Sequence, residues 1–121
     1  MNQRSANGRH AEQLALQYLE ARGLRLLERN FRSRHGEIDL VMREADCLVF
    51  VEVRYRRSGG YGGAAASVDG NKQARLVSTA LYYQLRHPAC AVQPTRFDVV
   101  ALTAQGEATS IEWIRDAFQA D

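Results

Sequence analysis

The sequence predicts an α/β fold in which a central mixed sheet lies between helices. The prediction rests on an amphipathic helical pattern at residues 9–22, short apolar strands within residues 24–54, and a second amphipathic helix at residues 70–86 with further strands after it. Helices and strands that alternate in this way cover the faces of one sheet. With 121 residues, 45% of them hydrophobic, the chain suits a single domain spanning residues 1–121, in which we expect residues 1–7 to be flexible.

The first helix is predicted from its periodicity. Polar residues recur along one stripe as far as Glu20, and Gly23 provides a C-terminal stop. Glu12 lies outside this stripe, between Leu16 and Leu19 at the edge of the apolar face. A carboxylate there requires a neutralising partner, or else it must reach out to water, and both interpretations remain open.

Three strands are expected to follow the first helix. Residues 24–31 alternate loosely between apolar and polar, and residues 36–42 and 48–54 are more strongly apolar. The polar stretch at residues 44–47 has the length of a hairpin turn, so we expect the second and third strands to pair antiparallel.

The second half of the chain is predicted to contain a helix and two more strands. Asp69 is a natural N-cap for the helix at residues 70–86. Residues 96–102 form an apolar strand, and residues 111–114 a short last strand followed by a terminal helical turn at residues 115–120. The expected order is therefore α-β-β-β-α-β-β.

Composition and charge indicate a cytoplasmic protein and leave open whether it contacts phosphate. No stretch approaches the roughly 18 apolar residues of a membrane helix, the N-terminus lacks the apolar core of a signal peptide, and Cys47 and Cys90 have no CxxC spacing. Net charge is only +2, and Lys72 is the only lysine among the 16 cationic residues. Arginine binds phosphate bidentately, although a GC-rich genome would produce the same bias.

The region from Gly36 to Arg57 carries the chemistry. Side chains alternate along a strand, so Glu52 and Arg54 share a face, and a hairpin brings Asp39 to Glu52. Mg2+ requires only one or two carboxylates, and its bound water and charge assist phosphodiester cleavage. A cross-strand salt bridge on a half-exposed sheet is the competing interpretation.

Several motifs along the chain resemble those of one bacterial family. They are Gly8-Arg9 with Glu12, Gly36-Glu37-Ile38-Asp39-Leu40, Phe50-Val51-Glu52-Val53-Arg54, Lys72-Gln73 with Arg75-Leu76, Arg96-Phe97-Asp98-Val99-Val100, and Ala117-Phe118. This series resembles the YraN-type family of endonuclease-like proteins, within the PD-(D/E)XK or restriction-endonuclease-like superfamily, and is similar to archaeal Holliday-junction resolvases. The resemblance implies a restriction-endonuclease-like sandwich.

The resemblance also implies a catalytic site. Glu12, Asp39 and Glu52 would be its acidic residues and would bind Mg2+ or Mn2+. Arg54 stands where the superfamily motif usually has lysine, and arginine stays charged, so it orients or stabilises without acting as a base. We hypothesise that Lys72 reaches the site and replaces the missing amine; otherwise it is a solvated residue of the first helical turn. Gln73 would support the site from the same helix.

These observations predict a nucleic-acid-binding protein that hydrolyses phosphodiesters in structured DNA, either branched or flapped. Its expected contacts to nucleic acid are Arg32, Arg34, Arg56, Arg57 and Tyr61. Tyr61 belongs to the glycine-rich residues 58–67, which form either a plain flexible loop or a flap over a phosphate chain. A non-catalytic DNA-binding module and a protein-interaction adaptor are the alternatives, and the resolvase likeness suggests a homodimer.

Overall fold

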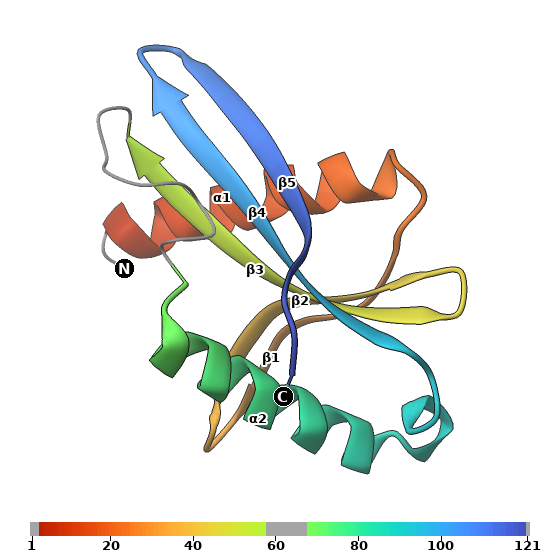
Figure 1. The fold of residues 1–121 in the computed structure, drawn as a ribbon. Helices are drawn as coiled ribbons and strands as arrows, with labels where there is room; N and C mark the ends of the chain where they lie inside the picture. The colour runs from red at the N-terminus through yellow and green to blue at the C-terminus, as the bar shows by residue number, and fades with distance from the viewer. Residues whose placement is uncertain (1–2, 58–67, 121) are drawn as a thin grey trace.

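In a computed structural model, the described part of the chain forms one mixed sheet of five strands, with two α-helices on its opposite faces (Figure 1). The structure describes residues 3–57 and 68–120, with side chains from residue 8 onward. Its elements are α1 (Gln3–Glu20), β1 (Arg25–Ser33), β2 (Gly36–Glu44), β3 (Cys47–Arg57), α2 (Gly70–Arg86), the 3-10 helix η2 (Pro88–Cys90), β4 (Thr95–Gln105) and β5 (Ala108–Phe118). The predicted fold class and element order are confirmed.

The strands lie in the sheet in the same order as in the chain, from β1 to β5. β1–β2, β2–β3 and β4–β5 are antiparallel, whereas β3 and β4 are parallel. Parallel neighbours require a crossover connection, and α2 lies in the segment that joins β3 to β4. α2 is therefore part of the crossover that connects β3 to β4.

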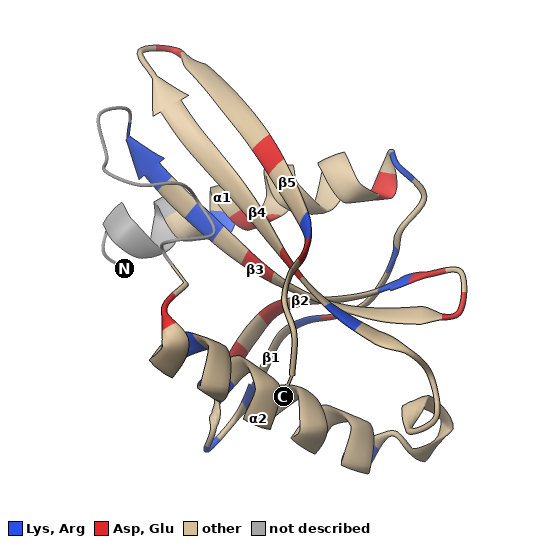
Figure 2. Cartoon of the chain, in the orientation of Figure 1, with Lys and Arg blue, Asp and Glu red and all other residues tan. Residues whose placement is uncertain are grey.

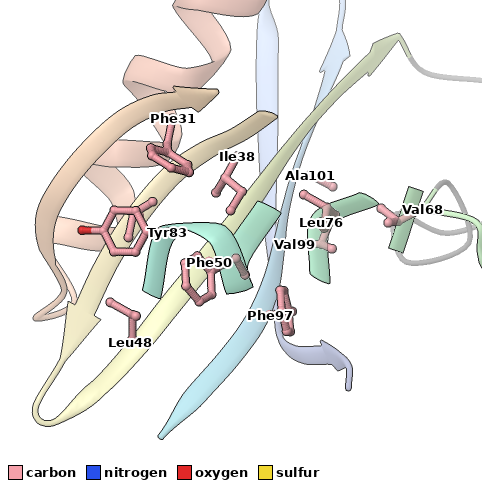
Figure 3. Close-up of a cluster of buried hydrophobic side chains, with 12 residues drawn as sticks. Phe31, Ile38, Leu48, Phe50, Val68, Leu76, Tyr83, Phe97, Val99 and Ala101 are labelled. Atoms are coloured by element: carbon pink, nitrogen blue, oxygen red, sulfur yellow. The ribbon is translucent and has the colours of Figure 1, made fainter. Parts of the chain in front are cut away.

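Apolar side chains form a separate core on each face of the sheet. Along β3, Leu48 and Phe50 pack toward α2, while Val49 and Val51 pack toward α1. A strand buried on both faces reads as one apolar run, which is why β3 is evident in the sequence. Figure 3 shows the α2-side cluster, which comprises Phe31, Ile38, Val41, Leu48, Phe50, Val68, Leu76, Ala80, Tyr83, Phe97, Val99 and Ala101.

The helix boundaries agree closely with the prediction for α2 and less closely for α1. The Asp69 side chain accepts a hydrogen bond from the Lys72 amide at 2.9 Å, so the predicted N-cap is confirmed. α1 begins at Gln3 instead of near residue 9. Of residues 1–7, which we expected to be flexible, residues 3–7 are helical and residues 1–2 are not among the described residues. Gly23, at φ +99°, ends the turn after α1 in a conformation that favours glycine.

The prediction for the C-terminus was wrong. β5 spans Ala108–Phe118 and pairs with β4 along this length, in place of a short strand at residues 111–114 and a helical turn at 115–120. The Asp116 amide donates to the buried carboxylate of Asp98 at 2.9 Å, at a β-bulge where Asp116 has φ +52°. This long-range contact extends the strand, and the local sequence gives no sign of it.

Asp98 holds the ends of β4 and β5 together through its buried carboxylate. The residue is only 1% exposed. Its carboxylate accepts two hydrogen bonds from Arg96, at 2.8 and 2.9 Å, and one from Trp113 Nε1 at 2.9 Å. Arg96 also contacts Glu44, whose pKa is lowered first by the hydrogen bond from Arg115 and then by that from Arg96. Buried charges are tolerated when they are paired in this way.

Neither of the described α-helices is long and apolar enough to cross a membrane.

Candidate active site

Strands β2 and β3 separate partway along the sheet. Their pairing ends at Leu40 and Val51, whereas β3 continues to pair with β4 as far as Arg57 and Ala104. One edge of β3 is therefore no longer paired with β2 beyond Val51. The Val53 amide donates instead to the side chain of Asp39, at 2.8 Å from Oδ2.

A cleft of about 520 Å³ opens where the strands separate. It is lined by Gly8, Ala11 and Glu12 of α1, Asp39 of β2, Glu52, Val53, Arg54, Tyr55 and Arg57 of β3, and Lys72 of α2. In Figure 2, acidic segments of β2 and β3 lie near each other at the centre of the molecule, and the end of β3 is basic. Five of the predicted catalytic residues, Glu12, Asp39, Glu52, Arg54 and Lys72, thus border one cavity.

A second, smaller cavity of about 100 Å³ adjoins the same acids. Asp39, Glu52 and Lys72 line both cavities, so they form the wall between them, and Arg75 of α2 borders the smaller one. Gly36 lies here as well, with φ +147°. A Cβ at this position would lie 3.3 Å from Thr79 Oγ1, so the glycine allows β2 to pack closely against α2.

Glu52 lies close enough to Asp39 to affect the ionisation of Asp39. Glu52 is only 4% exposed. The pKa of Asp39 is raised well above its ordinary value, first because the carboxyl group is withdrawn from solvent and second because Glu52 places a like charge beside it. The hydrogen bond from Val53 opposes this shift in pKa. Two neighbouring carboxyl groups that are largely withdrawn from solvent form a favourable environment for a cation.

Among the described side chains, two cations contact Glu52. Lys72 Nζ lies 2.9 Å and Arg54 Nη1 lies 3.3 Å from the same oxygen, Glu52 Oε2. Both cationic side chains are about one-third exposed, at 34% and 31%, so they also face the cleft. Lys72 therefore reaches the acidic cluster from the first turn of α2 instead of extending into solvent.

Glu12 is held at the rim of the cleft by β1. Its side chain is 13% exposed and accepts from Asn30 Nδ2, at 2.9 Å for Oε1 and 3.1 Å for Oε2. Arg29 Nη2 lies 3.8 Å from Oε1. The charge of Glu12 also contributes to the raised pKa of Asp39, which indicates that the two groups are near each other. The sequence suggested no role for Asn30.

Gln73 does not border the cleft. Its Nε2 donates to the Val68 carbonyl at 2.9 Å, and this bond ties the first turn of α2 to the preceding residues. The amide thus has the buried partner that its position on the apolar face of the helix requires.

The residues expected to contact nucleic acid are only partly brought to the cleft. Arg57 lines it, and Arg56 precedes Arg57 on β3 with a partly exposed side chain. Arg32 is exposed and paired with Glu37, and Arg34 is exposed near the β1–β2 turn; neither borders the cleft. Tyr61 lies outside the described residues.

Tyr55 is a cleft residue that the sequence analysis missed. It is 41% exposed and lies on β3 between Arg54 and Arg56. An aromatic side chain among arginines is a pattern typical of surfaces that stack nucleic-acid bases. The sequence Arg54-Tyr55-Arg56 could therefore have indicated Tyr55, whereas the prediction selected Tyr61 because of the glycine-rich residues around it.

Of the three predicted metal ligands, Asp39 and Glu52 are the two that could hold a magnesium-type ion. Across residues 3–57 and 68–120, no three His, Cys, Asp or Glu side chains are arranged to hold a metal ion together. Asp39 and Glu52 alone still match the one or two carboxylates by which Mg2+ is commonly held, its other ligands being water and phosphate. Glu12, bound by Asn30, would act from outside the ligand set.

The fold and the cleft define a small α/β protein with an acidic cluster at the unpaired edge of a central strand. Residues 11–102 match the family described as Uncharacterised protein family UPF0102, the YraN-type family that the motifs resemble, and the chain belongs to this family. A UPF0102 protein of Stutzerimonas stutzeri is 53% identical over 119 residues, covering 98% of this chain and 99% of the relative. That of Methylococcus capsulatus is 51% identical over 117 residues, covering 97% and 94%.

Proposed function

We propose that this protein binds structured DNA, branched or flapped, and hydrolyses its phosphodiesters with Mg2+ or Mn2+, as a member of the PD-(D/E)XK nuclease superfamily. One observation carries the proposal: carboxylates from three separate elements, Glu12 of α1, Asp39 of β2 and Glu52 of β3, border one cleft together with Lys72. The fold order and the sequence motifs support the same superfamily.

Asp39 and Glu52 are the residues that would hold the divalent ion. Such an ion lowers the pKa of a bound water and places positive charge against the scissile phosphate. Withdrawal from solvent and the neighbouring charge of Glu52 both raise the pKa of Asp39, so a cation placed between the two carboxylates would remove an existing repulsion. The carboxylate pair is therefore arranged to gain from binding a cation.

Lys72 and Arg54 are assigned to the phosphate. Both contact Glu52 Oε2 and both line the cleft, so each can turn toward an anion without leaving the site. Preorganised cations at a developing negative charge are an effective way to stabilise a transition state. Lys72 supplies the amine that the superfamily motif usually has at the position of Arg54, and Arg54 contributes fixed charge.

The remaining cleft residues suit a nucleic-acid strand. Arg57 and Arg54 provide cationic groups along the unpaired edge of β3, and Tyr55 exposes a ring beside them. Arginine binds phosphate bidentately, and an exposed aromatic ring stacks on any base. This arrangement favours a substrate that presents backbone and an unstacked base together, as junctions and flaps do.

Incubation of the purified protein with branched, flapped and linear DNA, with and without Mn2+, tests the proposal. We expect Mn2+-dependent cleavage of the structured substrates, and its loss in Glu52→Gln, which keeps the shape of the side chain. If no substrate is cut and Mn2+ alters neither DNA binding nor thermal melting, the enzymatic function is wrong.

A non-catalytic DNA-binding module is the second candidate, and one observation favours it. Glu52 is already neutralised by Lys72 and Arg54, so the cluster is satisfied without an added ion. This candidate predicts DNA affinity that falls steeply with salt and is unchanged when Asp39 or Glu52 becomes alanine. Enzymatic cleavage predicts instead that these substitutions abolish the effect of Mn2+.

A further inference from the structure

Asn30 has an unusual backbone conformation for a residue within a strand. Its φ is +51°, in the left-handed region, where asparagine is one of the few non-glycine residues found regularly. Pairing of β1 with β2 links Arg29 to Leu40 and then Phe31 to Ile38, so Asn30 lies level with Asp39 between these pairs. Asn30 of β1 therefore lies beside Asp39, where β2 is no longer paired with β3.

The positive φ changes which way the side chains of β1 point. Successive residues of a regular strand face opposite sides of a sheet. Here both Arg29 and Asn30 contact α1, through Gln13 and Glu12, whereas Phe31 joins the core on the α2 side. The left-handed residue therefore brings an extra side chain to the α1 face.

The Asn30 amide uses this position to hold Glu12. Its Nδ2 lies 2.9 and 3.1 Å from the two carboxylate oxygens of Glu12. Asn30 is itself exposed and Glu12 is largely covered, so the amide lies on the solvent side of the carboxylate. This neutral donor fixes the orientation of Glu12 without neutralising it, while the cation of Arg29 lies farther away, with Nη2 3.8 Å from Oε1.

We propose that Asn30 is a positioning residue that sets the carboxylate of Glu12 relative to Asp39 and Glu52. The inference rests on the proposed nuclease function and adds to it a residue outside the recognised motifs. Its backbone fixes the strand beside Asp39 and its side chain fixes Glu12, so two of the three acids depend on one asparagine.

Two single substitutions separate the backbone role from the side-chain role. Asn30→Gly keeps the left-handed conformation and removes the amide. Asn30→Asp keeps the shape and the tolerance of positive φ but replaces the donor by an acceptor that repels Glu12. We expect Asn30→Gly to melt close to wild type and to lower kcat at least about tenfold with little change in KM. Wild-type kcat in Asn30→Gly would overturn the inference.

A combined variant provides a readout that does not depend on activity. Asn30→Asp should lower the melting temperature by about 5 °C, and adding Glu12→Gln should restore most of it, because the new amide donates to the new carboxylate. Cleavage should stay lost, since position 12 has no acid. If the wild-type protein cleaves no DNA, the proposed nuclease function is wrong, and the melting data still test the role of Asn30. A melting temperature restored in the double variant then supports the placement of Glu12 by Asn30, and one that is not restored overturns that placement.

Discussion

The ammonium of Lys72 lies 2.9 Å from Glu52 Oε2, which connects the first turn of α2 to the unpaired edge of β3. The hydrogen bond from the Lys72 amide to Asp69 Oδ1 fixes the backbone of the same residue at the start of α2. An amine is therefore placed beside the acids although the strand motif itself contains Arg54. This contact places Lys72 where its role in the proposed nuclease can be tested directly.

Replacing Lys72 by alanine should abolish metal-dependent cleavage, with a loss on the order of 100-fold or more, because a charged donor aimed at the phosphate is removed. The melting temperature should change little, since Lys72 is 34% exposed and Arg54 still contacts Glu52. Arg86→Ala, which removes a cation from the last turn of the same helix, is the matched control. Unchanged cleavage in Lys72→Ala would contradict the assignment.

Asp39→Asn should stabilise the protein at neutral pH while removing the effect of Mn2+. Because the pKa of Asp39 is raised in the folded state, first by burial and then by Glu52, folding favours the protonated form. Stability is then fully present below the ordinary Asp pKa of about 4 and is lost as the pH rises through the raised pKa. Asparagine carries no charge, so it escapes this loss and still accepts the hydrogen bond from Val53.

Thermal melts of wild type and Asp39→Asn between about pH 4 and about pH 8 measure this difference. The variant should gain stability relative to wild type as the pH rises, by about 1 kcal/mol at the upper end. Asp46→Asn, in the exposed turn between β2 and β3, is the control and should show no such trend. A gap between variant and wild type that narrows with rising pH would refute the prediction.

Gly8→Ala should raise the stability of the protein and weaken its binding to DNA. Gly8 lies within α1 and lines the cleft, and a Cβ added there meets no atom within 4 Å. Alanine within a helix is about 0.5–1 kcal/mol more favourable than glycine, so the melting temperature should rise. A methyl group in the cleft should nevertheless weaken binding to branched DNA several-fold, measured by fluorescence anisotropy. Unchanged affinity would show that substrate does not approach α1.

Gly36→Ala should destabilise the fold by roughly 1–3 kcal/mol. The backbone at φ +147° disfavours a side chain, and the added Cβ would lie 3.3 Å from Thr79 Oγ1. Gly70→Ala is the control, because an added Cβ there meets nothing within 4 Å. Denaturant unfolding of both variants measures the difference, and equal stability would mean that β2 and α2 pack less tightly than described.

The sequence was most informative where residues are buried on a regular pattern. The apolar runs of β2, β3 and β4 and the cap at Asp69 are local signals, so the element order and the bounds of α2 were predicted correctly. The proximity of Asp39 and Glu52 also followed from strand alternation and a short hairpin. Their environment did not, because it depends on β2 leaving β3 after Leu40.

The features that were missed depend on contacts between distant parts of the chain. Asparagine tolerates the left-handed region, but nothing local marks Asn30 as the partner of Glu12, because that contact forms only when β1 packs against α1. The length of β5 likewise depends on the bond from the Asp116 amide to Asp98. Lys72 was open to two interpretations, because the reach of its side chain is set by how α2 docks on the sheet.

A crystal structure of the protein soaked in Mn2+ tests the central claim most directly. The anomalous signal of manganese locates the ion independently of water, and the Glu52→Gln variant provides the matched control. We predict a peak between the carboxylates of Asp39 and Glu52 in wild type and a loss of that peak in the variant. A wild-type structure with no peak there, and with Lys72 and Arg54 still in contact with Glu52, would contradict the proposed metal-dependent nuclease.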